Sequence, residues 1–176
     1  MMRIIEFFVQ LFWSMATKKL ILRPIEIIIN KNKNHAFNDN SLNLIDKIEA
    51  DIFYIDPPYN ERQYAPNYHL LETIAKYDNP KIKGVTGLRD YQNQKSNFCN
   101  AKNGITELSK IASEAKCKTL ILSYNTEGIM PQKEIITTLE KYGKVELVEF
   151  EYPRFKSNSN GDTKNKKFIR EQLYIL

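Results

Sequence analysis

The pattern of hydrophobic and polar residues along the 176-residue chain predicts strands and helices that follow one another in turn. Short runs rich in β-branched residues predict strands, at 25–29, 35–39, 51–55, 118–123, 145–152 and 168–176. Hydrophobic residues at helical spacing predict helices, at 3–16, 41–48, 69–77, 105–115 and 131–142. Between them, residues 60–68 show no period, and residues 78–103 favour a long loop of the kind that usually has a function. This order indicates an α/β sheet with one antiparallel edge strand, because the last two strands are expected to form a hairpin.

Composition and charge narrow the class of protein. The chain is 42% hydrophobic and 27% charged, which excludes wholesale disorder and is typical of one globular domain. No run approaches the ~18 apolar residues that span a bilayer, so we expect no membrane partner. Cys99 and Cys117 show no metal-ligand spacing, which favours reduced thiols in a cytoplasmic, prokaryotic protein, and no metal is implied. The segment from Pro153 to Arg170 holds six Lys or Arg and one Asp, so it accounts for the whole net charge of +5.

One short stretch has the residues for a catalytic site. A hydrophobic strand at 51–55 is followed at once by Asp56-Pro57-Pro58-Tyr59. A proline has no N–H and a fixed φ, so the two prolines end the strand. Asp56 and Tyr59 should therefore lie at the carboxyl edge of the sheet, where open α/β folds bind their ligands. The alternative is an ordinary turn after a strand, since Asp-Pro often opens one.

These residue types suit chemistry on the exocyclic amine of a purine, whose lone pair is delocalised into the ring. The Asp56 carboxylate can accept one amino hydrogen, and the carbonyl of Pro57 can accept the other. Two fixed acceptors favour a pyramidal nitrogen whose lone pair points at a methyl donor. The ring of Tyr59 can stack on a base that has been swung out of the duplex.

Several motifs together resemble one family over most of the chain. The residues that carry the resemblance are Asp56-Pro57-Pro58-Tyr59-Asn60, Arg62-Gln63-Tyr64, Asn67-Tyr68-His69-Leu70-Leu71-Glu72-Thr73-Ile74-Ala75, Leu122-Ser123-Tyr124-Asn125 and Tyr152-Pro153-Arg154-Phe155-Lys156. On these, residues 24–176 resemble the carboxyl-terminal half of the D12-type adenine-specific DNA methyltransferases of restriction–modification systems. The resemblance implies a three-layer, Rossmann-like fold and methyl transfer from S-adenosyl-L-methionine to N6 of adenine in double-stranded DNA. A cognate restriction endonuclease is the implied partner.

The resemblance also implies roles for individual residues. Asp39 stands where the family holds the adenine end of S-adenosylmethionine, and Asp56 lies at the cofactor's reactive end. Asp39 could equally cap the helix that begins after it. We expect contacts with DNA or the flipped base from Asn60, Arg62, Gln63, Tyr64, Tyr124, Asn125, Arg154, Lys156, Lys164, Lys166 and Lys167. The alternatives are a solvated loop at 60–64, a strand-end turn at 124–125 and a solvated hairpin tip at 154–167.

The chain departs from the family in its glycines. The family has a Phe-x-Gly-x-Gly turn ahead of this region that lets the backbone approach the cofactor, whereas all six glycines here follow the motif and none is spaced Gly-x-Gly. We therefore expect an amphipathic helix and connector at 1–23, and a catalytic domain at 24–176 that is truncated at its amino end. A second chain would then supply the cofactor half. The alternatives are an inactive DNA-binding remnant or subunit, and an amino-methyltransferase that acts on cytosine N4, a glutamine amide or RNA.

Overall fold

The computed structural model describes residues 26, 31, 33–153 and 168–176. The helix predicted at 3–16, the strand predicted at 25–29 and the basic segment 154–167 therefore lie outside the described residues. Contacts divide the chain into two compact units, Met1–Phe37 and Asn38–Leu176. All the strands and helices described below belong to the second unit, and the domain boundary predicted at residues 23 and 24 stays a prediction.

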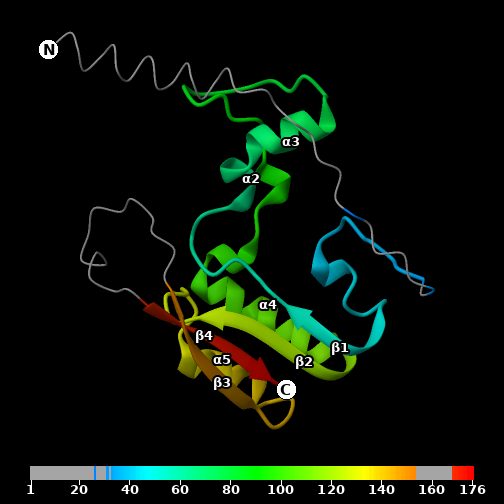
Figure 1. The fold of residues 1–176 in the computed structure, drawn as a ribbon, viewed down its shortest axis with the longest axis vertical. Coiled ribbons are helices and arrows are strands. Elements are labelled where there is room, and N and C mark those ends of the chain that lie inside the picture. Colours follow the sequence, from blue (N-terminus) through cyan, green and yellow to red (C-terminus); the bar gives the residue numbers. More distant parts are fainter. Residues whose placement is uncertain (1–25, 27–30, 32, 154–167) are drawn as a thin grey trace, which may run out of the picture. The chain divides into compact units, whose positions relative to one another are not determined.

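The second unit is a mixed α/β structure built on a four-stranded sheet. Its strands are β1 (Glu49–Ile55), β2 (Lys116–Asn125), β3 (Glu146–Pro153) and β4 (Phe168–Ile175), arranged in the order β1-β2-β4-β3 (Figure 1). β1 and β2 are parallel, whereas β4 is antiparallel to both β2 and β3. The predicted hairpin of the last two strands is thus confirmed.

The prediction that the antiparallel strand lies at the edge of the sheet is wrong. β4 lies inside the sheet, and β3 forms the edge. The side chains explain the order, because β4 buries Gln172 and Tyr174, whereas nearly every residue of β3 is exposed. A strand that carries Glu146, Glu149 and Glu151 is better placed at an edge, where charge discourages pairing with other chains.

Two helices cover one face of the sheet. α4 (Ala101–Glu114) and α5 (Gln132–Leu139) both lie against it (Figure 1). The side chain of Asn100 caps α4 by accepting a hydrogen bond of 3.0 Å from the amide of Asn103. The buried residues of the two helices pack on alternate residues of the strands. This core contains Leu108, Ile111, Ile135 and Leu139 from the helices and Leu120, Leu122, Tyr124 and Tyr174 from the strands.

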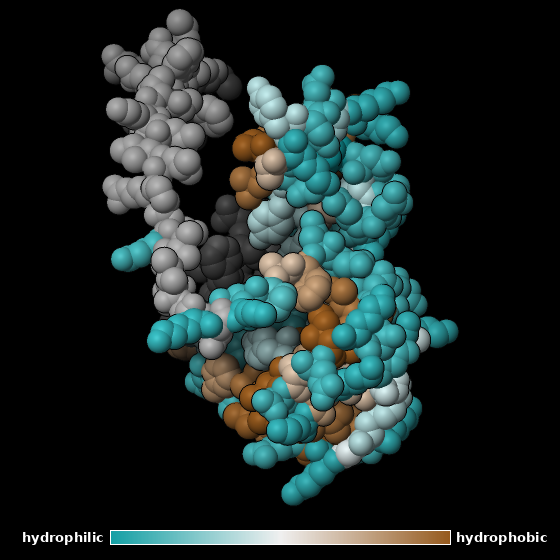
Figure 2. Space-filling model, turned by 90° about the vertical axis from the view of Figure 1, so that its right-hand side faces the viewer, coloured by the Kyte–Doolittle hydropathy of each residue, from teal (hydrophilic) through white to brown (hydrophobic). Residues whose placement is uncertain are grey.

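The opposite face of the sheet presents hydrophobic side chains to solvent. On β1, Ile52 and Tyr54 are 58% and 59% exposed, and Val148, Phe150 and Tyr152 of β3 are exposed as well. Figure 2, which looks from the side on which β1 lies, shows hydrophobic side chains gathered among hydrophilic ones in the lower half of the view. The alternation that packs the partly buried Phe53 and Ile55 against the core therefore puts their neighbours on the open face.

The segment before β1 differs from the prediction. Residues 35–39 form no strand, and no strand of the described residues pairs with them. A short extended segment needs such a partner for its backbone groups. The helix predicted at 41–48 is reduced to a 3₁₀ helix, η1 (Ser41–Asn43), followed by turns. Asn43 and Asp46 favour this outcome, because their side chains compete for backbone hydrogen bonds.

The segment after β1 contains more structure than predicted. The helix predicted at 69–77 is confirmed as α3 (His69–Lys76), but a one-turn helix, α2 (Tyr64–Asn67), precedes it. The predicted loop at 78–103 contains two 3₁₀ helices, η2 (Gln92–Gln94) and η3 (Asn97–Cys99), and α4 begins within it. α5 ends at Leu139, before the glycine expected to stop it. In the described part of the chain, no helix is long and apolar enough to cross a membrane.

Candidate active site and cofactor pocket

Asp56 lies where the sequence predicts it, directly after the last residue of β1. Pro57 is buried, whereas Asp56 and Tyr59 are exposed. The parallel pairing of Ile55 with Leu122 means that β2 runs on past the end of β1 for three further residues, Ser123 to Asn125. The Asp-Pro-Pro-Tyr turn is therefore bordered by the carboxyl end of β2.

Backbone hydrogen bonds hold the turn to the loop that follows β2. The carbonyl of Tyr59 accepts a hydrogen bond of 2.9 Å from the amide of Ile129 and a longer one, 3.4 Å, from the hydroxyl of Tyr124. That hydroxyl in turn accepts one of 3.1 Å from the amide of Met130. Tyr124 is only 3% exposed, and burial raises the pKa of its hydroxyl. Tyr124 thus faces the interior and connects the two loops.

Three tyrosines gather beside Asp56. Tyr59, Tyr64 and Tyr68 are 40%, 50% and 55% exposed, and the rings of Tyr64 and Tyr68 lie 6.0 Å apart at a tilt of 42°. The pKa of Tyr64 is raised, first by burial and then by the negative charges of Tyr59 and Asp56. Exposed aromatic rings beside a carboxylate can bind the face of a base while the acid binds its edge.

A second carboxylate, Glu171, lies near Asp56. It pairs with Asn125 of β2 on one side and with Phe150 of β3 on the other, so it lies toward the carboxyl end of β2. Its pKa is raised, first by burial and then by the negative charge of Asp56. Sequence reasoning missed Glu171, because an acidic residue in the last strand has no local signal, and only strand pairing brings it to this end of the sheet.

The side chain of Gln63 connects the segment after the motif to η3. Its amide nitrogen donates to the carbonyl of Ser96 at 3.0 Å, and its oxygen accepts from the amide of Ser96 at 2.7 Å. The thiol of Cys99 adds a bond of 3.4 Å to the carbonyl of Arg62. Asn60 also serves the local backbone, because its side-chain oxygen accepts a hydrogen bond from the amide of Arg62. Both amide side chains therefore stabilise the path of the chain after the motif.

Asp39 lies at the start of η1, where Asn40 is the N-cap. One oxygen of Asp39 accepts hydrogen bonds from the amide of Asn40 at 2.6 Å and from the side chain of Asn43 at 3.0 Å. The bond from Asn43, followed by the bond from Asn40, lowers the pKa of Asp39. The carboxylate is therefore held ionised, as an acceptor for a ligand requires.

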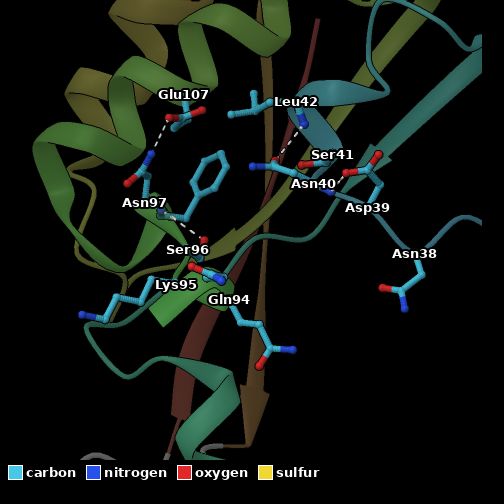
Figure 3. Close-up of a pocket in the computed structure, with 12 residues that line it drawn as sticks. Asn38, Asp39, Asn40, Ser41, Leu42, Gln94, Lys95, Ser96, Asn97 and Glu107 are labelled. Carbon is cyan, nitrogen blue, oxygen red and sulfur yellow. Dashed lines mark hydrogen bonds between the residues drawn. The ribbon is translucent and has the colours of Figure 1, made fainter. Parts of the chain in front are cut away.

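Asp39 lines a cavity of about 390 Å³, a size typical of small-molecule sites. Its walls are Asn38–Leu42 on one side and Asn93–Phe98 with Glu107 of α4 on the other. Figure 3 shows Asp39 apart from the pair formed by Asn97 and Glu107, which are joined by a hydrogen bond of 2.7 Å. Among the residues that the structure describes, the second carboxylate oxygen of Glu107 is buried and has no hydrogen-bond partner. A buried acceptor of this kind favours a ligand that brings a donor.

Comparison with known proteins identifies the family. Residues 9–138 match the D12 class N6 adenine-specific DNA methyltransferases. The chain belongs to this family. The resemblance seen in the sequence is therefore confirmed, and no solved structure matches the chain.

Curated relatives support the same assignment. The chain is 41% identical over 145 residues to the type II methyltransferase M.FokI of Planomicrobium okeanokoites, which covers 81% of this chain and 22% of the relative. It is 38% identical over 162 residues to the type II methyltransferase M.NlaIII of Neisseria lactamica, which covers 92% of this chain and 48% of the relative. The modification methylase StsI of Streptococcus sanguinis is 36% identical over 159 residues, which cover 89% of this chain and 24% of the relative. The chain thus spans from about a fifth to about half of the length of these D12-class relatives.

Within this member of the D12 class, the structure brings together only part of the predicted site. Asp56, Tyr59 and Tyr64 are close neighbours, and Tyr124 is joined to them through the backbone. Asp39 lines a cavity to which Asp56 does not contribute. Asn125 turns its side-chain oxygen to the amide of Glu127, 3.0 Å away, and so stabilises its own turn. The basic residues of 154–167 lie outside the described residues, and the roles assigned to individual site residues stay predictions.

Proposed function

We propose that the chain is the Asp-Pro-Pro-Tyr-bearing part of a DNA methyltransferase of a restriction–modification system, which transfers a methyl group to N6 of adenine. The observation that carries this proposal is the geometry of Asp56. An exposed carboxylate stands at the carboxyl end of the sheet beside exposed tyrosine rings, on a turn tied by hydrogen bonds to the next loop. Membership of the D12 class, and relatives named type II methyltransferases, support the reaction.

In this mechanism, Asp56 and the carbonyl of Pro57 hold the two hydrogens of the adenine amino group. Pro57 and Pro58 have no N–H. Neither of these residues can therefore donate a hydrogen bond that competes with the adenine amino group for the Asp56 carboxylate or the Pro57 carbonyl. The amino nitrogen would form a bond to the methyl carbon while the bond from that carbon to the sulfonium sulfur breaks, and the sulfur would leave as a neutral thioether. The nitrogen would lose a proton, which Asp56, already its hydrogen-bond acceptor, can receive. Fixed acceptors of this kind act mainly on the transition state.

The tyrosines hold the base. An adenine inside a duplex cannot reach Asp56, so it has to leave the stack at a cost of a few kcal/mol. Stacking on an aromatic ring returns about 1–3 kcal/mol per base. Tyr59, which is exposed and fixed through its carbonyl, is the ring nearest in sequence to the reacting group, and Tyr64 lies beside it.

The cavity at Asp39 is the proposed site for the adenosyl part of S-adenosyl-L-methionine. Its acceptors fit that group, because adenine and ribose present N–H and O–H donors to the Asp39 carboxylate and to the unpartnered oxygen of Glu107. The cofactor, when bound, supplies the methyl group as a sulfonium. For the fold, we propose that the described sheet belongs to a three-layer, Rossmann-like arrangement, which is supported by the parallel pair β1–β2 and the helices on one face.

The test is methyl transfer from tritiated S-adenosylmethionine to unmethylated genomic DNA, with the product digested to nucleosides. The expected product is N6-methyldeoxyadenosine, and the label should be lost in Asp56→Ala. Label in cytosine or in protein would contradict the proposed acceptor. An absence of label at millimolar cofactor would contradict the activity of this chain.

A further inference from the structure

We propose that Tyr124 and Gly128 form a clamp that positions the Asp-Pro-Pro-Tyr turn for reaction, with Tyr124 acting as a positioning residue. The proposal rests on the function proposed above and goes beyond it. It assigns to Tyr124 a task distinct from contact with DNA or substrate, which is the role expected from the sequence. The evidence is the set of contacts between the loop after β2 and the carbonyl of Tyr59.

The hydroxyl of Tyr124 has two partners. It donates to the carbonyl of Tyr59 at 3.4 Å and accepts from the amide of Met130 at 3.1 Å. The amide of Ile129 donates to the same carbonyl at 2.9 Å. One buried phenol thus joins the motif turn to the loop, and the second contact from Ile129 makes the connection rigid.

The loop itself has a fixed shape. The amide of Gly128 donates to the carbonyl of Asn125 at 3.0 Å, and the side chain of Asn125 holds the intervening turn. This turn places the Cα of Gly128 against the ring of Tyr124. A Cβ at residue 128 would overlap Cε1 of that ring and lie 2.5 Å from Cζ. The ring is 3% exposed and belongs to the core, so it cannot move aside without disturbing that core.

Because the motif turn is stiff, the contacts that hold Tyr59 also limit the position of Asp56. The turn is held at one end by β1, which ends at Ile55, and at the other by the carbonyl of Tyr59. Between these two points, Pro57 and Pro58 have φ fixed near −65°, which leaves few free torsions. Holding Tyr59 therefore limits the positions of the Asp56 carboxylate and the Pro57 carbonyl, the two proposed acceptors. A displacement of about 1 Å at such groups can cost on the order of 10²-fold in rate.

The experiment compares two clamp variants with two matched controls in the full chain. Tyr124→Phe removes the hydroxyl but keeps the ring, and Gly128→Ala forces the ring and the loop apart. Tyr174→Phe removes another buried hydroxyl, which donates a hydrogen bond of 2.9 Å to the side-chain oxygen of Gln172 in β4. Gly143→Ala adds a methyl group against the flexible end of Leu176.

The deciding readout is hydrogen exchange of the Ile129 amide, which donates to the carbonyl of Tyr59 at 2.9 Å, and this measurement needs no activity. We expect Tyr124→Phe to speed exchange there by roughly tenfold relative to Tyr174→Phe, as the loss of one hydrogen bond predicts. Gly128→Ala should act in the same direction, and Gly143→Ala should have no effect. Exchange of the Ile129 amide that is the same in Tyr124→Phe as in Tyr174→Phe would overturn the proposal, whatever happens to the melting temperature.

Methyl transfer gives a second, separate readout. Tyr124→Phe should lower kcat by about tenfold or more, with KM for S-adenosylmethionine unchanged, because a positioning residue acts on the reacting geometry. A rise in KM with unchanged kcat would overturn the proposal. If the unaltered chain transfers no methyl group, the proposed function fails, and the exchange measurement still decides whether the clamp exists.

Discussion

The amide of Ile129 donates a hydrogen bond of 2.9 Å to the carbonyl of Tyr59, and so joins the turn after β1 to the loop after β2. These two loops follow neighbouring parallel strands, whose carboxyl ends lie at the same edge of the sheet. The Asp-Pro-Pro-Tyr turn is therefore not a free turn at a strand end. Its backbone is held by a second segment that lies far from it in the sequence.

Asp56→Ala should remove methyl transfer while leaving DNA affinity nearly unchanged. In the proposed mechanism Asp56 aligns and polarises the reacting amine, whereas contacts with phosphates supply most of the affinity for DNA. The rate should fall by about 10²-fold or more, as for other fixed transition-state contacts. Single-turnover methylation and fluorescence anisotropy with labelled duplex measure the two effects separately.

Asp51→Ala is the matched control for this change. Asp51 belongs to the same strand and forms an ion pair with Lys118, in which both side chains are at least 79% exposed. Such pairs contribute little to stability. Near-normal turnover in Asp56→Ala would show that the role assigned to the motif is wrong.

Glu171 should make the chain less stable as the pH rises. Its folded pKa lies above the usual 4.5, because of burial and the charge of Asp56. Near that pH the native state therefore binds more protons than the unfolded state, and the free energy of unfolding falls as pH rises through the folded pKa. Urea denaturation between pH 4 and pH 7 should show a smaller fall in the free energy of unfolding for Glu171→Gln than for the unaltered chain.

The comparison variant for Glu171 is Glu146→Gln, which changes an exposed carboxylate on the neighbouring strand β3. Asp56→Asn should also reduce the fall, since it removes the second cause of the shift. An unaltered pH dependence in Glu171→Gln would mean that burial of this carboxyl is unimportant for stability.

The isolated 176-residue chain should bind S-adenosylmethionine weakly. The sequence contains no Gly-x-Gly, the feature that lets the backbone approach the cofactor in the family it resembles. Isothermal titration calorimetry should give a dissociation constant well above the micromolar range, and Asp39→Ala should weaken what binding there is. Micromolar affinity would show that other residues replace the glycine turn.

The basic segment 154–167 should bind DNA through phosphates. Replacing Lys164, Lys166 and Lys167 with alanine should flatten the plot of log affinity against log salt by roughly two to three units, at about 0.9 per lost phosphate contact. The loss should be similar for specific and random duplexes, because these residues position the DNA without reading its sequence.

A second triple variant controls for net charge. Lys133, Lys141 and Lys144 are exposed residues of α5 and the turns after it, outside the segment. Alanine at these three positions should leave the salt dependence almost unchanged. Equal slopes of log affinity against log salt in the two triple variants would mean that segment 154–167 does not bind DNA. The DNA contacts would then have to be sought in residues 60–68 and 78–103.

The sequence predicted the elements whose pattern is strong and local. The strands at 51–55 and 118–123 and the helices at 69–77 and 105–115 are present with small shifts in their ends. The strand predicted at 35–39 is absent, because pairing decides whether such a segment forms a strand. The sequence also could not predict that β4 lies inside the sheet, because the order of strands depends on how much side-chain surface each strand can bury.

For the site, the sequence by itself determined the motif, the family and the position of Asp56 at the end of a strand, because two prolines after a hydrophobic run act locally. The tertiary structure decided which other groups act on that carboxylate or on the turn that carries it. Strand pairing brings Glu171 toward it, and the turn after β2 sets the hydroxyl of Tyr124 on the carbonyl of Tyr59. These contacts join residues far apart in the chain, so they depend on register, burial and close approach at Gly128, which no local pattern of residues specifies.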